Sequence, residues 1–180
     1  MFARLVPLFV CFIGIALAIA SPAESQSADL GGLSIGDIIN ALQIGFIQNI
    51  TTFITLDTLS NNIASSQFRV KNPLIIELTI DSTSAKAGLN GTTYAEFTHT
   101  FKPALVVPVL RSVDSPTIGN VDLVQGATAS LDIIPFGVLD LQNVDINIRA
   151  GTLFGLGGIP IPITGLKQSN VPAAYDLELD

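Results

Sequence analysis

The sequence predicts a mainly β protein, an immunoglobulin-like antiparallel β-sandwich preceded by one amphipathic helix. Apolar and polar residues alternate with period two in several segments, and Gly, Pro and Asn separate these segments. No regular exchange of strands with long helices appears. With 180 residues, of which 48% are hydrophobic and 13% charged, the chain is long enough for one domain and too apolar for a disordered protein.

The N-terminus has the layout of a secretory signal peptide. Arg4 precedes an apolar run over residues 5–20 that ends in small residues. Because Ala18 and Ala20 suit signal peptidase, we expect cleavage between Ala20 and Ser21 and a secreted, extracellular protein with no stable membrane span. The alternative is an uncleaved leader that anchors the protein, although a spanning helix needs roughly 20 apolar residues.

Cleavage would remove Cys11, the only cysteine, so the mature chain could form no disulfide and no cysteine metal site. Residues 21–33 are small and polar and are expected to be a linker. Residues 34–52 form the predicted N-terminal helical region, in which Ser34 caps a helix that runs to about residue 47. Its apolar stripe consists of Ile35, Ile38, Ile39, Leu42 and Phe46.

Residues 53–180 form the predicted β-sandwich domain, because the period changes to two from residue 53 onward. The expected strand segments are residues 68–71, 76–80, 95–101, 127–133 and 144–149, and residues 53–56 are either a further strand or a continuation of the helix. The later run Ile159-Pro160-Ile161-Pro162-Ile163 cannot donate backbone hydrogen bonds at its prolines. We expect an edge strand that resists pairing with other chains, and the alternative is an apolar edge that docks a ligand or partner.

A strand that ends in Asn72-Pro73 and is followed at once by another amphipathic strand occupies residues 68–80. This arrangement resembles the group 2 late-embryogenesis-abundant domain, also called the water-stress and hypersensitive-response (WHy) domain, and especially related fungal proteins of unknown function. The resemblance implies an immunoglobulin-like sandwich over residues 53–180, with Asn72 and Pro73 at a corner between two strands. A residue before proline is pushed out of the helical region, and an asparagine amide can tie a turn.

Two triplets match the acceptor pattern for N-glycosylation, beginning at Asn49 and at Asn90. The pair Asn90-Gly91 is also typical of a two-residue hairpin turn, which would expose that site at a tip. We therefore favour Asn90 over Asn49, which lies among apolar neighbours.

No catalytic residue is predicted. Residues 32–36 match the G-x-S-x-G pattern of serine hydrolases, but too few residues precede Ser34 to supply a strand and an oxyanion loop. His99, the only histidine, lies between two phenylalanines and is interpreted as half-buried rather than as a base or ligand.

No cofactor or metal is predicted either. The oxygen-rich stretch Asp140, Asn143, Asp145 and Asn147 lacks the spacing of a calcium loop and fits the polar face of a strand. The glycine cluster at residues 155–158 lacks the Lys-Ser/Thr of a phosphate loop.

The charge balance excludes nucleic acid as a partner, because 15 acidic residues against 8 basic ones give a net charge of −7. The leading hypothesis is a secreted, non-catalytic protein with a binding or structural and protective role at the cell surface or outside the cell. The alternative is a carrier of lipid or another hydrophobic ligand. A small secreted hydrolase with dispersed carboxylates is a disfavoured third hypothesis.

Overall fold

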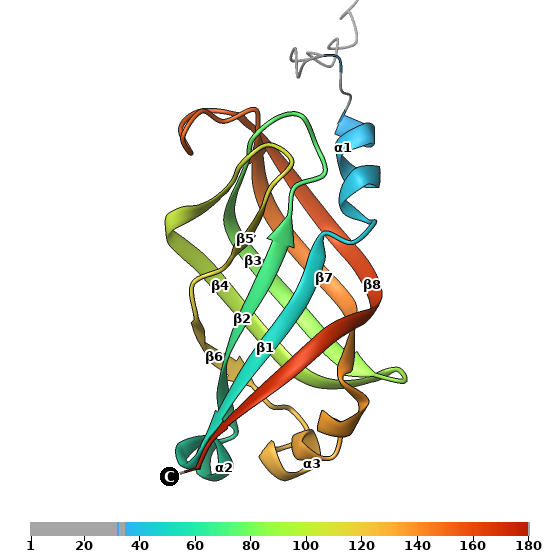
Figure 1. The fold of residues 1–180 in the computed structure, drawn as a ribbon, viewed down its shortest axis with the longest axis vertical. Helices are drawn as coiled ribbons and strands as arrows, with labels where there is room; N and C mark the ends of the chain where they lie inside the picture. Colours follow the sequence, from blue (N-terminus) through green and yellow to red (C-terminus); the bar gives the residue numbers. More distant parts are fainter. Residues whose placement is uncertain (1–31, 33–34, 180) are drawn as a thin grey trace, which may run out of the picture.

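The computed structural model describes residue 32 and residues 35–179, which form a closed β-barrel (Figure 1). The predictions for the signal peptide, for Ser34 and for all of the linker except residue 32 concern residues outside this part. The strands are β1 (Ile47–Thr55), β2 (Ile63–Lys71), β3 (Leu78–Leu89), β4 (Thr92–Val107), β5 (Ser112–Asp114), β6 (Ile118–Asp122), β7 (Val138–Ala150) and β8 (Ile159–Glu178). The helices are α1 (Ile35–Leu42), α2 (Leu56–Asn61), α3 (Ala127–Leu131) and the 3-10 turn η1 (Ile134–Phe136).

The sheet closes because its two ends pair with each other. The strand order β1-β8-β7-β3-β4-β6-β2 returns to its start through an antiparallel pairing of β2 with β1. The 20-residue strand β8 makes this possible, since Ile159 to Pro172 pair antiparallel with β7 and residues 173–178 pair parallel with β1. The short strand β5 pairs with the last residues of β2, while β6 pairs with its first residues.

The predicted antiparallel immunoglobulin-like sandwich is therefore wrong. The structure has a single seven-stranded barrel with its apolar faces turned inward, and one of its pairings, β1 with β8, is parallel. Alternation with period two only shows that each strand has one buried face, which holds equally for a barrel and for two stacked sheets. The closing pair Ile50 and Ala173 is too far apart in sequence for a local pattern to reveal it.

The predicted N-terminal helix is also too long. Helix α1 ends at Leu42, and Gly45, with φ of +67°, turns the chain into strand β1. Within residues 47–55 the buried side chains recur with the spacing of a strand, which the helical stripe ending at Phe46 obscured. None of the helices in the described residues has the length and hydrophobicity needed to cross a lipid bilayer.

A second local prediction fails at residues 127–133, which were expected to form a strand. They begin as helix α3 after Gly126, whose φ of +85° breaks the extended conformation, and the Ser130 hydroxyl donates to the Gly126 carbonyl at 3.0 Å. In so short a segment, alternating small apolar and polar residues are compatible with a helix as well as with a strand.

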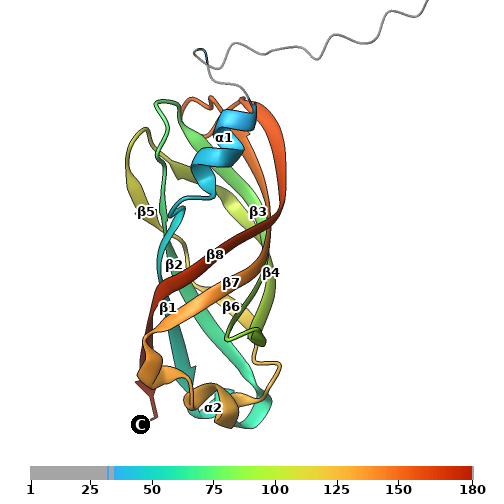
Figure 2. The ribbon, with the colours of Figure 1, turned by 90° about the vertical axis from the view of Figure 1, so that its right-hand side faces the viewer.

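The two ends of the barrel are covered by different elements. Helices α2 and α3 lie at one end, and α1 lies at the other end with the loops β2–β3, β4–β5 and β7–β8 (Figures 1 and 2). In α1, Ile38 and Leu42 have no exposed surface, and Phe46 just after it is also fully buried. The helix is therefore packed against the barrel.

This packing predicts the effect of truncating α1 side chains. Leu42→Ala should lower the free energy of unfolding by about 2–5 kcal/mol, because it removes a fully buried side chain and leaves a cavity. Ile44, which is 81% exposed in the following turn, provides the control, and Ile44→Ala should stay within about 0.5 kcal/mol of wild type. Urea unfolding followed by circular dichroism measures both, and equal losses would contradict this packing.

Candidate functional site

The interior of the barrel contains an apolar cavity of about 60 Å³. Its wall is formed by the inward faces of β1, β2, β3, β4, β6 and β7 together with Phe46. The lining side chains are Phe46, Ile47, Ile50, Thr52, Ser66, Phe68, Ile80, Thr83, Ala85, Ala87, Ala95, Phe97, Val121, Leu139, Leu141, Val144 and Ile146. Because none of these side chains is ionisable, the cavity offers binding to an apolar group but no acid, base or charge.

Small side chains on neighbouring strands create the space. Thr83, Ala85 and Ala87 follow one another on the inward face of β3, and Ala95 lies opposite Ala87 on β4. Ser66 on β2 adds another short side chain, whose hydroxyl donates to the Thr51 carbonyl at 3.1 Å. An interior normally fills such space with larger side chains, so the small residues leave room that a guest can occupy.

Within the described chain, the strand pairing around the barrel is shortest between β4 and β6. These strands share only the residue pair Glu96 and Asp122 within the described chain, whereas β3 pairs along most of its length with both neighbours. Phe97, which lines the cavity, is half-buried beside this seam. Beyond this pair, the Val124 amide donates to the Tyr94 carbonyl at 3.0 Å, and the side chains of Asn120 and Gln125 donate to carbonyls of β4 at 3.2 and 3.1 Å.

His99 lies on β4 two residues beyond Phe97. It pairs with Thr83 across the sheet and is half-buried, as expected from the sequence. Its ring meets Phe101 edge to face, with the ring centroids 4.8 Å apart. The aromatic contact accounts for its position, and no group of three or more metal-ligating side chains is present among the described residues.

Asn72 is a fully buried polar residue at the β2–β3 corner. Its side-chain amide donates to the carbonyls of Ile76, Val107 and Pro108 at 2.8, 3.1 and 3.2 Å, and its oxygen accepts from the Leu74 amide at 2.9 Å. The Asn72 side chain thus joins the β2–β3 corner to the end of β4. Pro73, the next residue, is half-buried beside it.

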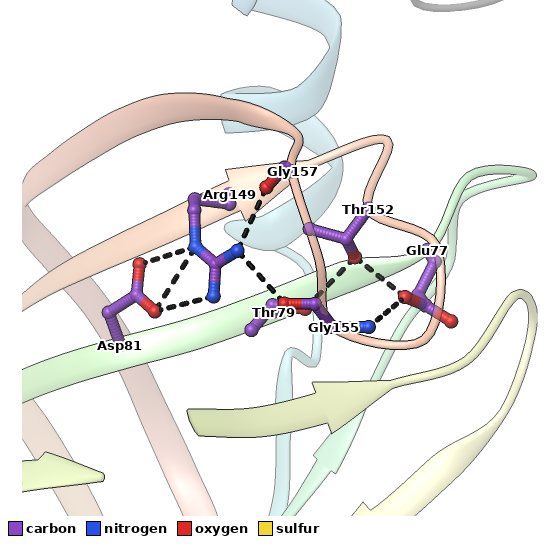
Figure 3. A network of polar contacts seen from close by, with 7 residues as sticks. All are labelled: Glu77, Thr79, Asp81, Arg149, Thr152, Gly155 and Gly157. Carbon is purple, nitrogen blue, oxygen red and sulfur yellow. Dashed lines mark hydrogen bonds and ion pairs between the residues drawn. The ribbon is translucent and has the colours of Figure 1, made fainter. Parts of the chain in front are cut away.

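A second polar network fixes the β7–β8 loop (Figure 3). The Arg149 guanidinium binds both oxygens of Asp81 through Nε at 3.2 and 2.9 Å, and one of them through Nη2 at 2.9 Å. Its Nη1 donates to the carbonyls of Gly155 and Gly157 at 2.9 and 2.8 Å. Hydrogen bonding to Asp81 raises the pKa of Arg149 above its ordinary value, so the guanidinium stays charged.

Glu77 binds the other side of the same loop. One of its carboxylate oxygens accepts from the Thr152 hydroxyl at 2.7 Å and from the Gly155 amide at 2.9 Å. The Thr152 hydroxyl also lies 2.9 Å from that of Thr79 on β3. The glycine cluster at residues 155–158 thus lies in a loop that Arg149 and Glu77 hold from two sides. The sequence analysis had assigned neither residue to a site.

The two glycosylation candidates differ in their surroundings. Asn90 and Gly91 form the two-residue turn between β3 and β4, both with positive φ, and Asn90 is exposed. Asn49 is half-buried within β1, opposite Arg69 of β2. The turn leaves room for a glycan at Asn90, and glycosylation at either residue remains a prediction.

The carboxylates of the oxygen-rich stretch serve the contact between β7 and β8. Asp140 accepts from the Asn170 amide at 2.9 Å and Asp145 from the Gly165 amide at 2.8 Å. Asn147 donates to the Ser82 hydroxyl at 2.9 Å. These side chains point to different neighbours along the outer face of β7 and do not converge on one point. The prolines of β8 are exposed and lie in the part of the strand that pairs with β7 alone.

Tyr175 on β8 carries a buried hydroxyl without a hydrogen-bond partner in the described part of the chain. Burial raises the pKa of Tyr175 to about 12, because ionisation would place a charge in a dry environment. Sequence reasoning had not singled out this residue. A lone tyrosine in an alternating strand gives no signal of an unsatisfied hydroxyl.

Comparison with known proteins gives little guidance. No known protein family matches the chain, and no curated protein is similar to it. One solved structure that is similar is described as a protein from Archaeoglobus fulgidus, with 9% sequence identity, coverage of 60% of this chain and 84% of that chain, and a TM-score of 0.27. That score supports no conclusion about fold or function.

The Asn72 contacts predict a large loss of stability on truncation. Asn72→Ala should lower the free energy of unfolding by about 2–4 kcal/mol, because it leaves buried carbonyls and the Leu74 amide without partners. Asn120, whose exposed amide donates only to the Thr98 carbonyl at 3.2 Å, is the matched control, and Asn120→Ala should cost less than about 1 kcal/mol. Urea unfolding measures both variants, and equal stability of the two would contradict the stabilising role of the Asn72 side chain.

Tyr175 predicts a pH dependence of stability. In the unfolded chain the hydroxyl ionises near its ordinary pKa of 10, while the folded protein resists ionisation up to about 12. The neutral hydroxyl therefore contributes its full stability below the pKa of the unfolded chain, and this contribution is lost as the pH rises through the pKa of the folded protein. Tyr175→Phe should remove this loss and raise the free energy of unfolding at neutral pH by about 1 kcal/mol. Urea unfolding of both proteins at neutral and alkaline pH measures this effect. Because the lysines are the same in both proteins, the difference between them is due to Tyr175.

Proposed function

We propose that this chain is a secreted, non-catalytic binding protein that holds a small apolar molecule, or the end of an alkyl chain, inside its barrel. The observation that carries the proposal is the 60 Å³ cavity with its wall of aliphatic, aromatic and short hydroxyl side chains. An apolar cavity of this kind stays free of water and gains stability when an apolar guest fills it.

The cavity volume limits the size of the guest. An engineered apolar cavity of about 150 Å³ binds benzene, and the present one is less than half as large. A guest therefore has a few carbon atoms inside the barrel, and a longer alkyl chain would extend toward the seam between β4 and β6. Rotation of the half-buried Phe97 at this seam would enlarge the space.

A structural or protective role outside the cell is the second candidate. It is favoured by the Asn72-Pro73 corner, the motif that carries the resemblance to the water-stress and hypersensitive-response domain. In this structure Asn72 ties two strand ends together, which supports a role in stability of the fold. The two candidates differ in whether a guest occupies the barrel.

Filling the cavity tests the proposal. Ala85 lines the cavity on β3, and Ala85→Val adds two carbons where the space lies. If the cavity is as described, this variant should gain about 1 kcal/mol in the free energy of unfolding and lose xenon binding, which the wild-type protein should show by NMR. Xenon is the probe because it is apolar and small.

Ala174→Val is the control, because Ala174 is exposed on β8 and the same change there tests only the strand preference of valine. If Ala85→Val instead costs about 1–3 kcal/mol and leaves the xenon signals unchanged, the barrel is already full. Native mass spectrometry of protein recovered from culture medium tests for a natural guest, and a clean apo mass would favour the structural role.

A further inference from the structure

Three loops at one end of the barrel expose large apolar side chains, which we call the apolar end surface. It consists of Ile75 in the β2–β3 loop, Val109 and Leu110 in the β4–β5 loop, and Leu153, Phe154 and Leu156 in the β7–β8 loop. Phe154 is 85% exposed and Leu156 is 76% exposed. Single exposed apolar residues are common, but six gathered on three adjoining loops mark an interaction surface.

Backbone hydrogen bonds hold the three loops side by side. The Leu110 amide donates to the Leu74 carbonyl at 3.2 Å, which joins the β4–β5 loop to the β2–β3 loop. The Gly151 amide donates to the Glu77 carbonyl at 2.9 Å, which joins the β7–β8 loop to the same neighbour. The exposed side chains therefore belong to one surface.

The β7–β8 loop is rigidly supported. Arg149 and Glu77 bind it from two sides (Figure 3), and the amides and carbonyls of Leu153 and Leu156 bond each other at 3.0 and 3.1 Å. A Cβ atom at Gly155 would lie 2.7 Å from Cγ2 of Val106 on β4, so the loop also packs closely on the barrel. The apolar side chains are thus presented in a fixed arrangement, which lowers the entropy cost of binding.

Two of the exposed residues have a strained backbone. Leu110 and Phe154 have φ of +54° and +52°, a left-handed conformation that bulky residues rarely adopt. Glycine would fit both turns without strain. Large apolar side chains at these positions are costly both in backbone strain and in exposure, which indicates that they serve a contact outside the barrel.

The charge distribution differs between the two ends of the barrel. Lys71 and Arg111 are exposed beside these loops and form no ion pair within the described residues. Glu77 and Asp81 are bound to the β7–β8 loop and to Arg149. Two exposed acids also lie at this end, Asp37 on α1 and Asp114 on β5, and Asp114 forms an ion pair with Arg69 at 3.4 Å. The opposite end and the C-terminal strand carry the exposed acids Asp57, Asp122, Asp132, Asp176 and Glu178.

We propose that the apolar end surface inserts into the outer layer of an anionic lipid membrane. Protruding loop tips, rather than a groove, match the nearly flat surface of a bilayer, and Lys71 and Arg111 match its negative charge. The acidic opposite end would face away from the membrane. Helix α1 also lies at this end of the barrel (Figure 2). The proposal does not depend on a guest in the barrel.

Vesicle binding tests the proposal. Protein recovered from culture medium should sediment with phosphatidylcholine vesicles that contain about one-third phosphatidylserine, and less with phosphatidylcholine alone. Phe154→Gly should weaken this binding about tenfold or more, because it removes the most exposed aromatic ring. Since glycine relieves the positive φ, the variant should be at least as stable as wild type, so weaker binding cannot be ascribed to unfolding.

Phe136→Gly is the matched control, because Phe136 is 61% exposed in η1 at the opposite end of the barrel. It should bind vesicles as the wild-type protein does. A double variant, Lys71→Gln with Arg111→Gln, should lose the preference for phosphatidylserine while retaining binding to phosphatidylcholine.

Three results would overturn the proposal. In the first, the wild-type protein sediments with neither kind of vesicle. In the second, Phe154→Gly and Phe136→Gly lose vesicle binding equally. In the third, ultracentrifugation shows a concentration-dependent dimer that Phe154→Gly abolishes. The last result would assign the surface to contact between copies of the chain.

Discussion

The fold depends on strand β8, which pairs with two different neighbours along its 20 residues. Its first part extends the sheet beyond β7, and its last part lies parallel to β1 and completes the barrel. A sheet that closes on itself leaves few unpaired edges and shields one continuous interior from water. With the only cysteine in the predicted leader, burial and backbone pairing carry the stability of the described domain.

Closure also determines what the interior can do. In the closed sheet the short side chains of Thr83, Ala85 and Ala87 on β3 and of Ala95 on the neighbouring β4 line the interior, and they leave part of it unfilled. The resulting cavity is apolar and none of its lining side chains is ionisable, so it suits a guest that prefers to leave water. The β4–β6 seam, where one residue pair joins the two strands, is the proposed route for such a guest.

The polar networks serve the loops rather than the cavity. Asn72 ties the β2–β3 corner to the end of β4, while Arg149 and Glu77 fix the β7–β8 loop. Together they hold the loops at one end of the barrel in one arrangement, and on this support Phe154 and Leu110 keep conformations that an unsupported loop would abandon. Binding inside the barrel and docking at its end would be compatible, since a membrane is a source of small apolar molecules and alkyl chains.

The sequence alone determined that the protein is mainly β and that Asn90 and Gly91 turn a hairpin between two strands. The first follows from local periodicity and the second from the conformational preferences of two residues. Only the tertiary structure decided that the sheet closes into a barrel, that α1 stops at Leu42, and that residues 127–131 are helical. Closure depends on which strand edges meet, and Ile50 meets Ala173 across most of the domain. Alternation reports only that a strand has a buried face, not which partner covers its edge.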